Sequence, residues 1–533
     1  MKLFIVLLTG AFMLATGTSD VFAKKKEKVQ TEVKSDTVQT ASKKRNTQYP
    51  RLFKNKRVVT KKGLITIHKI DDKLYFEFPK SLLGREFLMG SSISATSDNT
   101  SGLVGQTMTT PLHIRFAIQE DQVYMQNVTP VSRMDVYSNQ SDISKAVAKS
   151  NITPDMESFK IAAYNMDSTA VVFEVTKFFL ADNKRLPLFD QNSSSLEDEK
   201  YGQLELKAVL KKNLSSIRNF YVFDDNLEIN LDMSFYQSLL ASKKEVRGGN
   251  VRVKAVYSML LLPEETMVWR LGDPRLGYTF TKKQKISTEK DGTAFSYLQH
   301  KWNLLPADEE AYRRGDLVAP RKPVVFYIDS DFPEAWKKAI KEGVNWWNEA
   351  FKMAGFKDAV QTADFPANDT TFYAGNLKYS CIRYVPVNLS KTQSKVWVDP
   401  RSGEIINGTI FVGHDIAKTI ASQRFVQTAQ VDERMRGIQL SEEVLLEGIR
   451  LYVAREVGHC LGLADNASAS AAFSVESLRS PEFTRQNGIA SSVMDELPYN
   501  YIAQPQDGKA DFIQNKLGAY DLFAIQMGYM LVP

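Results

Sequence analysis

Short runs of apolar and β-branched residues, separated by polar turns, fill the chain from about residue 50 to residue 320. Runs of four to eight such residues are typical of strands rather than helices. The pattern predicts two β-rich domains, one over residues 50–128 and one over residues 129–320. The expected strands are 64–68, 74–78, 114–118, 123–128, 170–178, 227–233 and 251–262, and a short helix is expected at 143–149.

The pattern changes after residue 320 to strands that alternate with amphipathic helices. A buried type of strand at 324–328 precedes a predicted helix at 333–354, which ends at Gly355. Apolar residues at steps of three and four along this helix form one broad face for a core. These apolar positions are Trp336, Ile340, Val344, Trp347 and Phe351.

The rest of the C-terminal region predicts two more strands and two more helices. The strands are expected at 396–398 and 405–412, on either side of a turn. A helix is expected at 441–462, because Ser441 can cap it and acidic residues follow in its first turn. A last helix is expected at 520–529. The chain is therefore predicted to be a multidomain α+β protein, with an α/β domain over residues 321–533.

The N-terminus has the features of an export signal. Residues 1–23 combine a lysine, an apolar run and a short cleavage site, as a secretory signal peptide does. No later apolar run reaches the roughly 18 residues of a membrane span. We expect an exported protein, periplasmic or extracellular, that is not an integral membrane protein.

Charge is concentrated in one segment behind this signal. Residues 24–49 hold eight Lys or Arg and three Asp or Glu, a net +5 out of the +6 of the whole chain. The segment is predicted to be a solvated basic linker. The folded body is then almost neutral, which argues against a nucleic acid as partner.

Cys381 and Cys460 are the two cysteines of the chain. They allow one disulfide at most, so the protein is not a disulfide-stapled scaffold. Cys381 lies in a strand-like run and Cys460 on the predicted helix 441–462. The sequence leaves open a bridge or two buried thiols, and favours the thiols.

One stretch of this helix has the spacing of a zinc-protease motif with the wrong first residue. In HExxHxxGxxH, two histidines one helical turn apart bind one cation, and the glycine lets the chain bring in a third ligand. Here Arg455 stands at the first ligand position, His459 at the second and Asp465 at the third. A guanidinium remains protonated and has no lone pair for a metal.

Several motifs in the same order resemble a family of large exported bacterial zinc-dependent metalloproteases of the metzincin type. Members carry two N-terminal β-rich domains of unknown function before a metzincin-like α/β metalloprotease domain. The resemblance covers nearly all of the chain after the signal peptide. Its motifs are LYFEFPKSLLGREFL (74–88), GDPRLGY (272–278), PVVFYID, GVNWWNEAFKMAGF, VDPRSGEI, REVGHCLGLADN, SVMD and YDLFAIQMGY.

The resemblance implies roles for individual residues. Glu456 matches the general base that activates a zinc-bound water, His459 matches a zinc ligand, and Met494 matches the methionine turn below the metal. Three positions depart from the family pattern. Arg455 replaces the first histidine, Asp465 replaces the third, and Glu496 stands where relatives carry a tyrosine.

These departures fit one hypothesis about charge. A guanidinium in a partly buried seat needs a partner, and Asp465 can supply one, with Glu456 or Glu496 as further contributors. We therefore expect an ion pair between Arg455 and Asp465 in place of a metal. In an alternative arrangement, His414 joins His459 and Asp465 and restores a metal site.

The leading interpretation is a catalytically inactive metzincin-like protein without cofactor, acting as a binding or interaction module for a protein or peptide. An extended peptide is expected against an edge strand around 409–412. The alternative is an active zinc metallopeptidase with rearranged ligands that works through Glu456. In a third possibility the β-rich half carries the function, for example by recognising a surface glycan.

Overall fold

The computed structural model describes most of the chain from residue 48 onward. The predicted signal peptide and residues 24–47 of the predicted linker lie outside the described residues, as do parts of the predicted helix 143–149. The described residues are 48–98, 104–105, 107–128, 134–136, 145–146, 149–189, 196–198, 200, 202–286, 292–369, 371–387, 392–508 and 510–531.

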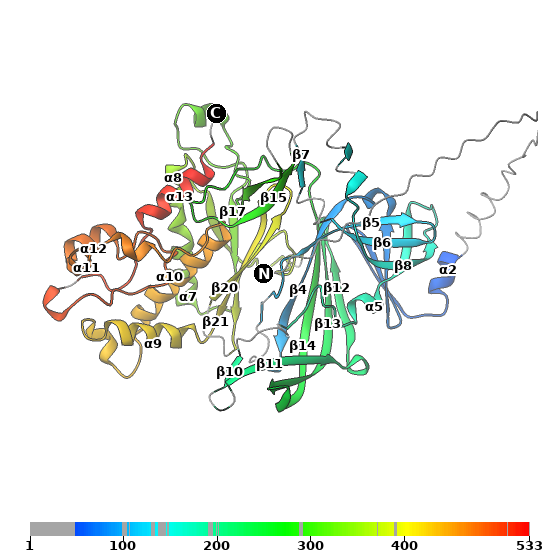
Figure 1. Cartoon of the computed structure of the whole chain (residues 1–533), viewed down its shortest axis with the longest axis horizontal. Coiled ribbons are helices and arrows are strands. Elements are labelled where there is room, and N and C mark those ends of the chain that lie inside the picture. The colour runs from blue at the N-terminus through cyan, green and yellow to red at the C-terminus, as the bar shows by residue number, and fades with distance from the viewer. Residues whose placement is uncertain are drawn as a thin grey trace, which may run out of the picture. The chain divides into compact units, whose positions relative to one another are not determined.

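A large antiparallel sheet of 13 strands is built from the described residues between 58 and 261 (Figure 1). In this sheet β4 (Glu86–Thr96) pairs with β14 (Lys244–Leu261), so it joins strands from both sides of residue 128. The boundary predicted at that residue stays a prediction. The other strands are β1 (Val58–Lys62), β2 (Thr66–Ile70), β3 (Lys73–Pro79), β5 (Leu112–Gln119), β6 (Gln122–Asn127), β8 (Asp155–Tyr164), β9 (Ala170–Glu174), β10 (Leu196–Asp198), β11 (Gly202–Leu210), β12 (Ser216–Val222) and β13 (Asn226–Ala241).

Most strands predicted in this region are confirmed, with shifted ends. The runs expected at 227–233 and 251–262 are parts of the longer strands β13 and β14, which pair with each other. The second half of the strand predicted at 170–178 is wrong. β9 ends at Glu174 and helix α5 (Thr176–Phe179) follows. The helical turn places Phe179 in the core, where its side chain is 1% exposed, and this burial favours the helix over a longer strand.

A small separate sheet combines strands from two distant parts of the sequence. It contains β7 (Met134–Val136), β15 (Phe280–Ile286) and β16 (Ala294–Gln299). β15 and β16 form an antiparallel hairpin in which Phe280 is opposite Gln299. Just before this hairpin, Tyr278 forms a backbone bridge with Leu463, so the hairpin is tied to the C-terminal region.

The C-terminal region is a five-stranded sheet with helices packed against it, as predicted. The order is β18-β17-β19-β21-β20, parallel except for β20. Figure 1 shows helices α7, α10 and α13 on one side of these strands. The strands are β17 (Val324–Ile328), β18 (Val360–Asp364), β19 (Ser380–Val385), β20 (Thr392–Asp399) and β21 (Glu404–Gly413).

The long helices agree with the sequence pattern. The helix expected at 333–354 is present but interrupted at Trp346, and Gly355 follows it with a φ of +85°, a conformation that suits glycine. None of the helices among the described residues is long and apolar enough to cross a membrane. The helices of this region are α6 (Glu309–Arg313), α7 (Glu334–Asn345), α8 (Trp347–Met353), α9 (Ile416–Thr428), α10 (Glu442–Cys460), α11 (Val475–Arg479), α12 (Pro481–Asn487) and α13 (Ala519–Tyr529).

The predicted edge strand is wrong. Strand β21, which contains 409–412, is hydrogen-bonded on both sides: Ile410 is opposite Ile382 of β19 and Ser394 of β20. Among the strands that the structure describes, the edge of this sheet is β20, which pairs with β21. Local pattern does not reveal this order, because the pairing joins residues that are far apart in sequence.

Both cysteines are free and buried. Of the two alternatives left by the sequence, the structure therefore contains the unbridged one. Burial raises the pKa of the Cys381 thiol to about 12, so the thiol stays protonated at neutral pH.

Helices α7 and α10 touch at Gly343. A Cβ atom at this position would lie 2.5 Å from the carbonyl oxygen of Arg450 and 3.3 Å from the backbone nitrogen of Ala454. Both neighbours are backbone atoms of a helix, so neither can rotate away. The close approach of the two helices therefore depends on glycine.

We expect Gly343→Ala to lower the free energy of unfolding by about 1–3 kcal/mol, because the added methyl forces α7 away from α10. Chemical denaturation monitored by tryptophan fluorescence measures this loss. Gly249→Ala is the matched control, since a Cβ atom there meets nothing within 4 Å. Equal stability of the two variants would contradict the predicted contact.

Candidate functional site

Helix α10 carries most of the candidate residues. Its N-cap is Ser441, whose hydroxyl accepts a hydrogen bond from the Val444 backbone nitrogen. The helix packs its apolar face into the C-terminal core, with Val453 and Val457 fully buried. Its last turns therefore stand in a fixed position against strands β20 and β21.

A cavity of about 1280 Å³ lies over strand β20 and the end of α10. Glu456 and His459 both line it, together with residues of the β-rich region and of the β15–β16 hairpin. We call this cavity the cleft. Its other lining residues on the C-terminal sheet include Ser394, Val396, Val398, Pro400 and Ile405.

Glu456 is held at the wall of the cleft and is 5% exposed. One of its carboxylate oxygens accepts a hydrogen bond of 2.9 Å from the Thr392 hydroxyl, at the start of β20. This contact fixes the carboxylate beside the edge strand. No sequence signal pointed to Thr392, because its role arises from a pairing across 64 residues.

His459 presents one ring nitrogen to the loop after the helix and one to the cleft side. Nδ1 lies 2.9 Å from the Leu463 carbonyl oxygen, and a carbonyl can only accept, so Nδ1 carries a proton. Nε2 lies 3.2 Å from an oxygen of Asp465. The ring is thereby oriented as a metal-binding histidine would be, but it faces a carboxylate.

The expected ion pair between Arg455 and Asp465 is confirmed. Nη2 of Arg455 donates to Oδ1 of Asp465 over 2.5 Å, and the same oxygen faces His459. Within the part of the chain that the structure describes, Glu456 and Glu496 form no ion pair with Arg455, and Glu496 is exposed. The positive charge of Arg455 is thus paired with the negative charge of Asp465.

The pair is only partly shielded from water. The Arg455 side chain is 23% exposed and that of Asp465 is 51% exposed, whereas Nε of Arg455 is buried without a partner. Arg455 and Asp495 both line a second cavity of about 190 Å³, and Oδ2 of Asp495 is also buried without a partner among the described residues. An ordered water between two such groups is the ordinary way to satisfy them.

Met494 is fully buried below the last turn of α10. Its sulfur lies where a Cβ atom of residue 458 would clash with it, so the glycine at 458 is needed for the contact. The Met494 carbonyl oxygen accepts a hydrogen bond from the Asn466 backbone nitrogen, which ties the methionine to the loop after Asp465.

His414 is not part of this arrangement. Its Nδ1 lies 2.6 Å from the Tyr384 hydroxyl and its ring stacks beside Trp336. His414 does not line the cleft with His459. The expected alternative, in which His414 joins His459 and Asp465, is therefore not formed in this structure.

Two other histidines do line the cleft, although no motif singled them out. His300 bonds the Thr279 and Thr281 hydroxyls, and burial lowers its pKa to about 4, so its ring is neutral at neutral pH. His113 pairs with Glu86 over 2.8 Å. Both belong to regions before residue 321, so the cleft is shared between the β-rich and the C-terminal parts of the chain.

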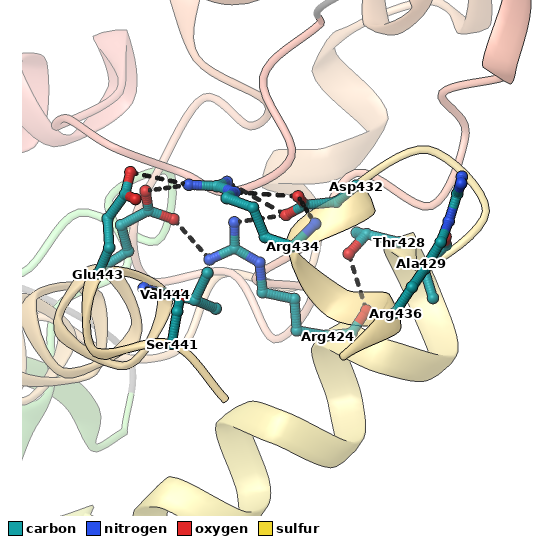
Figure 2. A network of polar contacts seen from close by, with 10 residues as sticks. Arg424, Thr428, Ala429, Asp432, Arg434, Arg436, Ser441, Glu443 and Val444 are labelled. Carbon is teal, nitrogen blue, oxygen red and sulfur yellow. Dashed lines mark hydrogen bonds and ion pairs between the residues drawn. The ribbon is translucent and has the colours of Figure 1, made fainter. Parts of the chain in front are cut away.

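A network of charged side chains joins the first half of α10 to the elements before it (Figure 2). Arg424 of α9 is completely buried and donates to Asp432 over 2.9 Å and to Glu447 of α10 over 2.6 Å. Arg434 also contacts Asp432 and Glu447, and adds Glu443 at 3.1 Å. We call these five residues the arginine network. It links α9, the 3-10 turn Glu433–Arg436 and the first half of α10.

Comparison with known proteins agrees with this architecture. Residues 437–533 match the model of a family described as Met-zincin, residues 105–307 match a domain of unknown function, and residues 47–96 match another such domain. No curated protein and no solved structure matches the chain. Residues 437–533 are thus metzincin-like and follow two regions that resemble uncharacterised domains.

The Met-zincin description implies a zinc ion in typical members. A catalytic zinc site ordinarily has three protein ligands and an open position. Around α10 the chain offers His459 and Asp465, while Arg455 occupies the first ligand position and already binds Asp465. Among the described residues, no group of three His, Cys, Asp or Glu side chains has the geometry to hold a metal. These residues do not fit a three-ligand zinc site.

Removing Arg424 should destabilise the protein strongly. We expect Arg424→Met to lower the free energy of unfolding by about 3–5 kcal/mol, because Asp432 then keeps its buried charge with one partner less. Denaturant titration at neutral pH measures the effect. Arg218→Met is the control, since Arg218 is half exposed and lies 3.8 Å from its carboxylate partner. Similar losses for both variants would refute this role of the arginine network.

The same network predicts how stability depends on acid. Burial raises the pKa of Asp432, but hydrogen bonds from Arg434 and Arg424 outweigh it and the pKa is lowered overall. A lowered pKa in the folded state means that Asp432 stabilises the protein above its unfolded pKa of about 4 and loses this contribution as the pH falls further. Lowering the pH below about 4 should therefore reduce the free energy of unfolding more in the wild-type protein than in the Arg424→Met variant. Parallel pH profiles of the two proteins would count against this assignment.

Proposed function

We propose that this chain is an exported metzincin-like protein that has lost peptide hydrolysis and works as a binding module for a protein or peptide. The observation that carries the proposal is the ion pair of Arg455 with Asp465 at the positions of the first and third zinc ligands. The proposed signal peptide at 1–23 accounts for export.

The ion pair takes over the structural part of a metal's role. In a zinc enzyme, the metal joins the helix to the loop behind it. Here the guanidinium of Arg455 makes that connection to Asp465, and the buried Met494 closes the site from below as the proposed methionine turn. Glu456 then has no activated water beside it and acts as a structural carboxylate bonded to Thr392.

Binding without cleavage is supported by the shape of the site. The cleft has room for several residues of an extended chain, at about 1280 Å³. Strand β20 is the free edge of the C-terminal sheet along the cleft. An extended peptide can pair with such an edge through its backbone and place alternate side chains in the cleft.

Purified wild-type protein is expected to contain well under one zinc per chain and to hydrolyse no peptide. The triple variant Arg455→His, Asp465→His, Glu496→Tyr restores the family ligands, so it should bind about one zinc per chain. Metal analysis after dialysis and a peptide-cleavage assay measure both. Adding Glu456→Gln to the triple variant is the control that separates zinc binding from hydrolysis.

The opposite result would favour an active zinc metallopeptidase with rearranged ligands. If wild type retained about one zinc per chain and Glu456→Gln abolished a measured hydrolysis, the proposal would be wrong. Failure of the triple variant to bind zinc would show that the scaffold itself has changed. It would contradict the hypothesis that only the zinc ligands were lost.

A further inference from the structure

An unusual group of exposed aromatic side chains stands on the β15–β16 hairpin. Phe280, Phe295 and Tyr297 are 52%, 53% and 37% exposed. In the hairpin register Lys282 is opposite Tyr297, and Phe280 and Phe295 lie two residues away along their strands, so all four share one face. We call these four residues the aromatic platform.

The platform is ordered by its own contacts. The rings of Phe280 and Tyr297 meet edge to face with centroids 4.8 Å apart, and Nζ of Lys282 lies 3.8 Å from the centroid of Phe295. Lys282 has no carboxylate within ion-pair distance among the residues that the structure describes. Among the described residues, the platform therefore presents flat apolar surface next to a cation that is in contact with a ring and not with a carboxylate.

The platform belongs to the cleft. Phe280, Lys282 and Phe295 line the same cavity as Glu456 and His459. The backbone nitrogen of Thr279, directly before Phe280, donates to the Gly462 carbonyl oxygen over 2.8 Å, so the hairpin is fixed to the loop after α10. The cleft is thus lined both by the edge strand β20 and by the aromatic platform.

We propose that the aromatic platform selects peptides in which an aromatic side chain is close to an Asp or Glu. Exposed aromatic surface inside a cavity is costly unless a ligand covers it, and flat rings recognise another ring by offset or edge contacts. Lys282 complements a carboxylate of the ligand. The free edge of β20 supplies backbone hydrogen bonds, which favour a peptide over a sugar chain as the occupant.

This inference rests on the proposed binding function and adds the chemistry of the ligand. It also gives the region that resembles an uncharacterised domain a definite task, since the platform lies within residues 105–307. The specificity would then come from the β-rich part of the chain, and the backbone pairing from the metzincin-like part.

The test begins with a displayed library of random linear peptides, selected on the full-length protein. We expect the selected peptides to be enriched in Phe, Tyr or Trp next to Asp or Glu. A synthetic peptide of the selected sequence should bind Phe280→Ala and Phe295→Ala at least about tenfold more weakly than wild type, as expected for aromatic anchors of an interface. Fluorescence anisotropy measures the affinities.

Two further variants sharpen the comparison. Phe425→Ala is the matched control, because Phe425 on α9 is 55% exposed and does not line the cleft. It should bind like wild type. Lys282→Glu should weaken binding of the acidic peptide, and replacing the acidic residue of the peptide by Lys should restore it.

The outcomes separate the two proposals. Selected peptides that lack an aromatic preference, or that bind Phe280→Ala as well as wild type, but lose affinity for Val396→Arg in the cleft, would overturn the platform inference and leave the binding function in place. A library that gives no binder, combined with glycan binding that depends on Phe280, would overturn both and indicate a sugar ligand.

Discussion

The ion pair between Arg455 and Asp465 fixes the position and the charge of the side chains at the end of α10. One carboxylate oxygen of Asp465 lies close to both the guanidinium of Arg455 and the imidazole of His459. A backbone hydrogen bond from the Asn466 nitrogen to the carbonyl oxygen of the buried Met494 also ties the loop to this site. The pair of opposite charges therefore joins the last turns of α10 to the loop that follows the helix.

The cleft combines parts of the chain that are far apart in sequence. Glu456 and His459 come from α10, the edge strand β20 precedes that helix, and the hairpin β15–β16 comes from before residue 321. This arrangement explains why no single motif describes the whole site.

Local pattern predicted the local elements well. Helix α10 begins where Ser441 and two glutamates predict it, and the apolar face of α7 and α8 ends at Gly355 as expected. The motif spacing also predicted the Arg455–Asp465 pair, because positions 455, 459 and 465 converge wherever a helix ends in such a loop. These inferences needed only the helical period, charge and the chemistry of a guanidinium.

Long-range pairing was beyond the reach of the sequence. Nothing in the runs of β4 or β14 indicates that they meet, and the order of β19, β21 and β20 puts the edge on a strand that the pattern did not favour. The bond from Thr392 to Glu456 and the aromatic platform of the cleft depend on the same non-local contacts. In each case tertiary packing decides which strands or side chains meet, and the periodicity of a single sequence does not reveal that choice.

The backbone bridge between Tyr278 and Leu463 has a practical consequence for dissecting this protein. The Tyr278 side chain is buried in the C-terminal core and its hydroxyl donates to the Ala524 carbonyl oxygen, while Trp302 donates to that of Cys460. A fragment cut at residue 321 would lose these partners and expose part of its interior. Recombinant fragments that contain the metzincin-like part should therefore begin before Leu271. They then include Tyr278 and Trp302, which pack against the C-terminal core.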